Sequence, residues 1–128
     1  MNENQIGKVV VDVALAIHRD LGPGLLETVH ETALAMALAE RDLTTERQVP
    51  ITFEYAGHVF REGFRADLVV NSKVIVEVKS VELLKAVHKK QLLTYLRLSK
   101  MRLGFLLNFG AALMKEGVVR IVNGLPDD

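Results

Sequence analysis

Residues 64–80 read FRADLVVNSKVIVEVKS, and the other predicted elements are arranged around this stretch. Two apolar runs flank residues 71–73, a cluster of turn-forming residues, which predicts two β-strands joined by a tight hairpin. A three-residue loop pairs Val70 with Val74. Because side chains alternate along a strand, each strand should place one apolar set on a single face. The expected sets are Phe64, Ala66, Leu68 and Val70 in the first strand and Val74, Val76 and Val78 in the second.

The same register sets Asp67 directly opposite Glu77. Like charges at opposed positions lie about 4.5–5.5 Å apart at Cβ and destabilise a sheet. A divalent cation between the two carboxylates would remove that repulsion, and oxygen ligands suit Mg²⁺ or Mn²⁺. Lys79, on the face that carries Glu77, would then point at whatever the cation holds. The alternative is that both acids face water, with Arg65 and Lys79 as neutralising partners.

Several blocks of the sequence resemble a known group of proteins. Asp67, followed after a short hairpin by Glu77-Val78-Lys79, resembles the D…ExK signature of the PD-(D/E)XK nuclease superfamily. Four blocks in order, from about Ile6 to Leu125, resemble the smaller GxxExxY family. They are Gly24-Leu25-Leu26-Glu27 with His30, then Phe64-Arg65-Ala66-Asp67, then Glu77-Val78-Lys79, then Gln91-Leu92-Leu93-Thr94-Tyr95. His30 stands where that family has Tyr, and Ala66 where the superfamily has Pro.

The resemblance implies a metal-dependent nuclease. It implies Mg²⁺, with Mn²⁺ as a substitute, held by Asp67, Glu77 and the backbone carbonyl of Val78. Lys79 would orient the attacking water and offset charge in the transition state. Three further residues are expected at the catalytic site on the same grounds: Glu27, Gln91 and Tyr95.

The composition fits one domain spanning residues 1–128, with 49% apolar residues and no cysteine. No apolar run approaches the roughly 18 residues of a membrane span, and no signal peptide is apparent, so a cytoplasmic location is expected. The net charge is zero, which argues against a strong non-specific nucleic-acid binder. Residues 1–68 nevertheless hold six Lys/Arg against eleven Asp/Glu, whereas residues 69–128 hold ten against five.

Apolar periodicity predicts the remaining elements. Helices are expected at residues 4–20, 24–41 and 83–99, and further strands at 46–55, 103–109 and 118–122. Pro50 favours an edge position for the first of these strands, because proline cannot donate to the ladder. The order ααβββαββ predicts an α/β class protein, a restriction-endonuclease-like sandwich with a mixed central sheet. The second helix is expected to bury Leu26, Val29, Ala33, Met36 and Ala37, and the third to turn inward a stripe of Leu84, Val87, Gln91, Thr94 and Leu98.

A basic cluster opens the third helix, at Lys85, His88, Lys89 and Lys90. It is either a nucleic-acid-binding group that contacts phosphates beside the site or simply a solvated helix face. The expected partner is nucleic acid, with DNA favoured, and no membrane is expected; a homodimer stays open because the chain is short. The alternative function is a non-catalytic nucleic-acid- or protein-binding module on the same fold.

Overall fold

The computed structural model describes residues 1–126, and the chain forms a mixed α/β fold around one five-stranded sheet. The elements in chain order are α1 (Glu3–Leu21), α2 (Glu27–Glu40), β1 (Thr45–Tyr55), β2 (His58–Val70), β3 (Val74–Lys79), α3 (Ala86–Ser99), β4 (Leu103–Asn108), α4 (Met114–Gly117) and β5 (Val118–Val122). The predicted helices and strands are confirmed to within about three residues at their ends, except that β2 begins at His58, six residues before the predicted start at Phe64. The one-turn helix α4 was not predicted.

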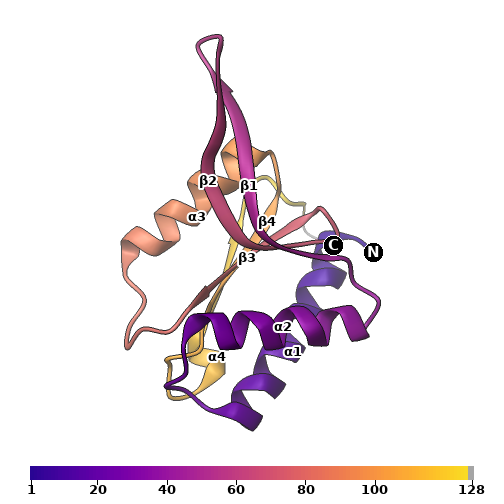
Figure 1. The fold of residues 1–128 in the computed structure, drawn as a ribbon, viewed down its shortest axis with the longest axis vertical. Coiled ribbons are helices and arrows are strands. Elements are labelled where there is room, and N and C mark those ends of the chain that lie inside the picture. The colour runs from indigo at the N-terminus through magenta and orange to yellow at the C-terminus, as the bar shows by residue number, and fades with distance from the viewer. Residues whose placement is uncertain (127–128) are drawn as a thin grey trace.

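The strands follow one another across the sheet in the order β1-β2-β3-β4-β5. All neighbours are antiparallel except β3 and β4, which α3 connects as a parallel pair. That crossover and the edge position of β1, which contains Pro50, agree with the sequence-based expectation. Beyond the sheet, β1 and β2 project as a long hairpin, while α2 lies across the opposite end of the fold (Figure 1).

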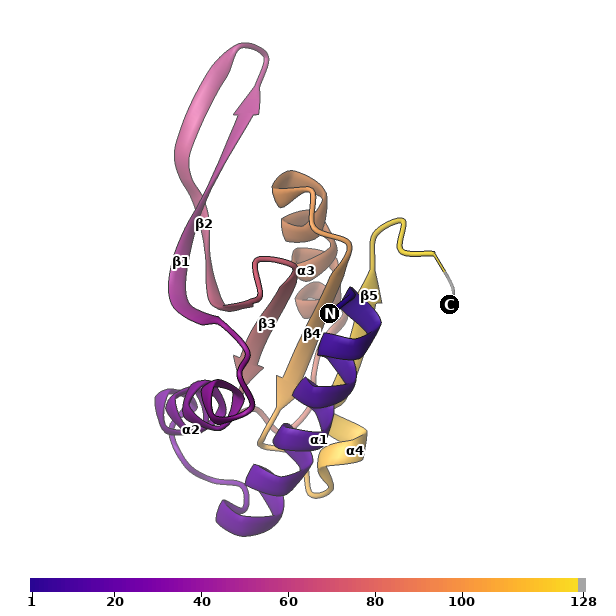
Figure 2. The same cartoon turned by 90° about the vertical axis from the view of Figure 1, so that its right-hand side faces the viewer.

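Two apolar layers cover the two faces of the sheet. On one face, α1 and α2 bury residues such as Ile6, Val10, Leu34 and Leu38 against the sheet. On the other face, α3 buries Leu92 and Leu96. Figure 2 shows α1 and α3 on opposite sides of the central strands. Strands β3 and β4 lie between the layers and are almost completely buried, as expected for strands covered on both faces.

The inward faces predicted for α2 and α3 are only partly right. Ala33, Ala37, Leu84 and Leu98 are half-buried against the core as predicted. In α2, Leu26, Val29 and Met36 are exposed, and the buried residues are His30, Glu31, Leu34 and Leu38. In α3, Val87, Gln91 and Thr94 are exposed instead of turned inward. Apolar residues surround α2 on most sides, so spacing alone did not select the face that packs.

The predicted apolar face of β2 is also wrong in one respect, because the strand changes faces near its middle. Phe64 and Ala66 pack in the layer under α3, whereas Leu68 and Val70 pack in the layer under α1 and α2. The β1–β2 register is continuous from Arg47↔Leu68 to Val49↔Ala66, but Gln48 and Asp67 between them are not paired in the ladder. Gln48 has a φ of 50°, in the left-handed region that side chains rarely adopt. This irregular step turns Asp67 out of the normal alternation.

Among residues 1–126, the structure has no helix that is both long enough and apolar enough to cross a membrane.

Candidate functional site

Strands β2 and β3 separate at the point where the site begins. Their ladder runs from Val70↔Val74 to Leu68↔Val76 and stops there. Asp67 and Glu77, the next residues in the same register, are therefore not paired through their backbones. Instead, the backbone N–H of Asp67 donates to Oε2 of Glu77 at 2.8 Å, and the backbone N–H of Val78 donates to Oδ2 of Asp67 at 2.8 Å. Asp67 and Glu77 were predicted to face each other as a ladder pair. In the structure, each carboxylate instead accepts a backbone N–H from the other strand.

This geometry disfavours the ionised form of Glu77. Glu77 is only 6% exposed, and its pKa is raised to about 8, first by burial and then by the negative charge of Asp67. The charge of Lys79 acts in the opposite direction. Arg65 contributes no neutralising partner, because its guanidinium pairs with Glu62. The alternative in which both acids face water is therefore wrong for Glu77.

The donor set suits a hard divalent cation. The carboxyl groups of Asp67 and Glu77 lie together, and the backbone N–H of Val78 contacts Asp67. Among the described residues 1–126, no group of three or more His, Asp or Glu side chains is placed to hold a metal ion. A cation would therefore complete its coordination with water or substrate oxygens, which is how Mg²⁺ is usually bound beside phosphates.

Lys79 closes β3 on the face that carries Glu77. Its position opposite Asn108 in β4 is held by a hydrogen bond from the backbone N–H of Phe109 to the Lys79 carbonyl, at 2.8 Å. The side chain is half-buried, and its positive charge acts to lower the pKa of Glu77, against the larger effects of burial and of Asp67. The structure therefore places Lys79 near enough to Glu77 for their charges to interact.

Glu27, the first residue of α2, also reaches this end of β3. Its Oε2 accepts the backbone N–H of Ser80 at 3.0 Å, and the hydroxyl of Ser80 donates to the Leu25 carbonyl at 3.1 Å. These two contacts tie the start of α2 to the residue that follows Lys79. The positive end of the helix dipole favours an acid there.

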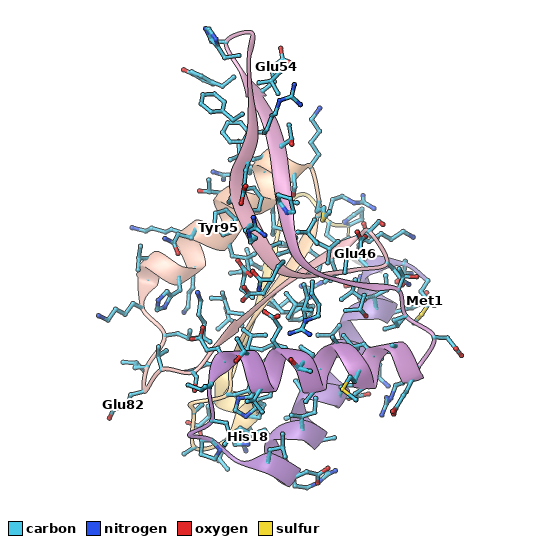
Figure 3. The ribbon with its side chains drawn as sticks, in the orientation of Figure 1. Met1, His18, Glu46, Glu54, Glu82 and Tyr95 are labelled. Carbon is cyan, nitrogen blue, oxygen red and sulfur yellow. The ribbon has the colours of Figure 1, made fainter. Side chains whose placement is uncertain are left out.

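Tyr95 lies where α3 faces β2 (Figure 3). Its ring stacks on Phe64 with centroids 4.1 Å apart and planes within 4° of parallel. Burial raises the pKa of Tyr95, and the negative charges of Glu77 and Asp67 raise it further. The Tyr95 hydroxyl is therefore within range of electrostatic interaction with both acids. Gln91, one turn earlier on α3, is exposed, so its predicted position on the inward stripe is wrong.

The basic cluster at the start of α3 is exposed at its three lysines, Lys85, Lys89 and Lys90. His88 is half-buried, and its Nδ1 accepts the backbone N–H of Lys85 at 3.0 Å, which caps the helix. Lys89 lines a cleft of about 380 Å³ that Asn108 and Val119 also border. The three lysines are thus accessible, and within residues 1–126 no hydrogen bond or ion pair joins the cluster to Asp67 or Glu77.

Three residues that border the site were not predicted from the sequence: Glu31, Arg47 and Gln48. Glu31, one turn after Glu27 on α2, is 5% exposed and accepts from both Arg47 and Gln48 of β1. An acid four residues after Glu27 shares its helix face, a spacing that could have indicated Glu31.

His30, which the family resemblance also singled out, has a different role. It is fully buried and stacks on Phe109 with centroids 4.3 Å apart, so it belongs to the core.

Comparison with protein-family models gives one match, over residues 4–121, to the model described as the PD-(D/E)XK nuclease superfamily. The chain belongs to the PD-(D/E)XK nuclease superfamily. Its five-stranded mixed sheet is consistent with the restriction-endonuclease-like fold of that superfamily. The finer resemblance to the GxxExxY family stays a prediction.

Members of this superfamily are generally nucleases. A solved structure titled "Crystal structure of SSO0001" is similar to this PD-(D/E)XK chain, with a TM-score of 0.45 and 19% sequence identity. The match covers 91% of this chain and 67% of that one. The comparison with curated proteins found no match.

Proposed function

We propose that this chain is a metal-dependent nuclease that hydrolyses phosphodiester bonds of nucleic acid, with DNA as the favoured substrate. The observation that carries the proposal is the interlocked pair of Asp67 and Glu77, with Lys79 following on the same face of β3. Superfamily membership supports the reaction class.

In this proposal Asp67, Glu77 and the carbonyl of Val78 hold Mg²⁺, for which Mn²⁺ can substitute. When bound, such a cation lowers the pKa of a coordinated water molecule and stabilises negative charge on the phosphate. The raised pKa of Glu77 supports this assignment, because a nearby cation would offset both the burial and the repulsion from Asp67.

The other residues of the site act by position and charge. Lys79 orients the attacking water and stabilises negative charge that develops on the phosphate. Glu27, tied to the backbone after Lys79, adds a further carboxylate at that end of the site. Tyr95 contacts the substrate from α3, with Gln91 beside it on the exposed surface, and the cluster of Lys85, His88, Lys89 and Lys90 binds phosphates along α3.

The rival proposal is a non-catalytic module that binds nucleic acid or protein. Such a module has no need to keep the buried acid Glu77 against the half-buried Asp67, since an unused acidic pair costs stability. The retention of Asp67, Glu77 and Lys79 together therefore favours catalysis.

Cleavage of labelled single-stranded and double-stranded DNA and RNA with Mn²⁺, with and without chelator, tests the proposal. We expect chelator-sensitive cleavage that is lost in Asp67→Asn and kept in Lys115→Ala, a matched change of an exposed residue on α4. Binding of nucleic acid without cleavage in all four substrates would instead support the non-catalytic module.

A further inference from the structure

Gln48 has a backbone conformation that its packing does not explain. It is exposed and lies in the middle of β1, yet its φ of 50° is in the left-handed region. A residue other than glycine rarely adopts this conformation, and such outliers cluster at functional sites. The irregular step therefore calls for an explanation in the contacts of the side chain.

The side-chain amide of Gln48 bridges two acids from different elements. Its Nε2 donates to Oε1 of Glu31 at 2.7 Å and to Oδ1 of Asp67 at 3.3 Å. A carboxylate oxygen accepts hydrogen bonds, so the amide must present its NH₂ group to this pair. The reverse orientation would set the amide oxygen against two carboxylates.

Glu31 is itself held firmly, so it can fix the amide. It is 5% exposed on α2, and its Oε2 accepts from Nε and Nη2 of Arg47 at 3.1 and 2.9 Å. Arg47 also donates to the hydroxyl of Thr32 at 2.8 Å. This two-pronged contact offsets the charge of Glu31 and leaves Oε1 for Gln48.

Asp67 is consequently held at both oxygens. Val78 N–H donates to Oδ2 at 2.8 Å, and the Gln48 amide donates to Oδ1. A carboxylate held at both oxygens cannot rotate freely about its terminal bond. Partners of this kind orient ligand groups in metal sites, and their loss typically costs 10–100-fold in metal affinity or activity.

We propose that Gln48 is a positioning residue for the Asp67 carboxylate, anchored through Glu31 on α2. The inference rests on the proposed function, because it assigns Asp67 to the cation site. The left-handed backbone of Gln48 is the local cost of aiming its amide at both acids. In this way α2 and β1 set the orientation of an acid that β2 carries.

Two variants of the same residue separate the amide from the backbone. Gln48→Gly removes the amide but accepts a positive φ without strain, whereas Gln48→Ala removes the amide and keeps the strain. Thr52→Ala is the matched control: Thr52 is also exposed on β1 and donates to a β2 carbonyl, that of Arg61, at 2.7 Å, away from the acids.

Mn²⁺ affinity, measured by calorimetry without nucleic acid, is the first measurement. We expect the Kd to rise about tenfold or more in both Gln48 variants and to stay within about twofold of wild type in Thr52→Ala. In cleavage assays kcat should fall while KM for the nucleic acid stays the same. A Gln48→Gly protein that binds Mn²⁺ as tightly as wild type would overturn the proposal, as would weaker binding in the Ala variant alone.

Amide hydrogen exchange in the presence of chelator is the second measurement, and it needs neither metal nor cleavage. If Gln48 holds Asp67, exchange at the Val78 amide should accelerate in Gln48→Gly and not in Thr52→Ala. An unchanged Val78 amide would overturn the proposal. The wild type could cleave no nucleic acid while the Gln48 variants still bind Mn²⁺ more weakly and Gln48→Gly still exchanges the Val78 amide faster. That result would refute the nuclease assignment and leave the positioning role of Gln48 intact.

Discussion

Asp67 and Glu77 hold each other's strand in place of a regular β-ladder: Glu77 accepts the backbone N–H of Asp67, and Asp67 accepts the backbone N–H of Val78, each at 2.8 Å. Each acid thus compensates for a backbone hydrogen bond that the separated strands no longer make. The same arrangement brings two negative groups together in a largely buried place. The repulsion between them should therefore affect metal binding and the pH dependence of stability.

Lys79→Ala is expected to abolish cleavage while Mn²⁺ binding and the fold stay nearly intact. Its charge acts on the water and the transition state, so the single-turnover rate should fall by about a hundredfold or more. Lys115→Ala, an exposed lysine of α4, is the control. An unchanged single-turnover rate in a folded Lys79→Ala protein would remove this lysine from the mechanism.

Metal binding should stabilise the protein through Asp67. Without metal, and at a pH above the value of about 8 at which Glu77 ionises, Asp67→Asn should leave the melting temperature unchanged or raise it, because it removes charge repulsion with Glu77. With Mn²⁺ at about a hundredfold excess over Kd, the wild type should gain about 2.7 kcal/mol, and the Asn variant should lose most of that gain. Thermal melts of both proteins with Mn²⁺ and with chelator measure this, and a wild-type melt unaffected by Mn²⁺ would contradict a site formed in the free protein.

Stability without metal should fall as the pH rises through the range in which Glu77 ionises. The folded pKa of about 8 lies above the ordinary value of 4.5, so the folded state binds the extra proton between these values. The stability that this proton contributes is therefore fully present below about pH 4.5 and is lost progressively toward pH 8. Denaturant unfolding of the wild type and Glu77→Gln in chelator, across this range, tests the prediction. The Gln variant should show a clearly smaller dependence on pH, and equal dependences would contradict the assignment.

Replacing Lys85, Lys89 and Lys90 with Ala should weaken nucleic-acid binding and flatten its salt dependence. All three side chains are exposed on or beside the first turn of α3. For every phosphate that is no longer neutralised, the slope of log K against log salt should become shallower by about 0.7–0.9. Binding titrations at several salt concentrations measure the slope, and a slope equal to that of wild type would identify the cluster as a solvated helix face.

The order of the elements and the central acid pair could be predicted from local sequence patterns. Turn-forming residues and alternation along β3 are local signals, so the hairpin loop, the pairing of Val70 with Val74 and the positions of Glu77 and Lys79 on one face could be predicted. The edge position of β1 followed in the same way from Pro50, which cannot donate to a ladder.

Which faces pack, and which residues surround Asp67 and Glu77, depend on contacts between distant segments of the chain. Helix α2 is apolar on most sides, so its contact with the sheet, and not its spacing, selected the face with Glu31. The change of face in β2 depends on the irregular step at Gln48, a residue nineteen positions from its partner Asp67. No local sequence pattern predicts the left-handed backbone conformation of Gln48. Its strain is offset by hydrogen bonds to Glu31 and Asp67, which only the fold brings close from α2 and β2.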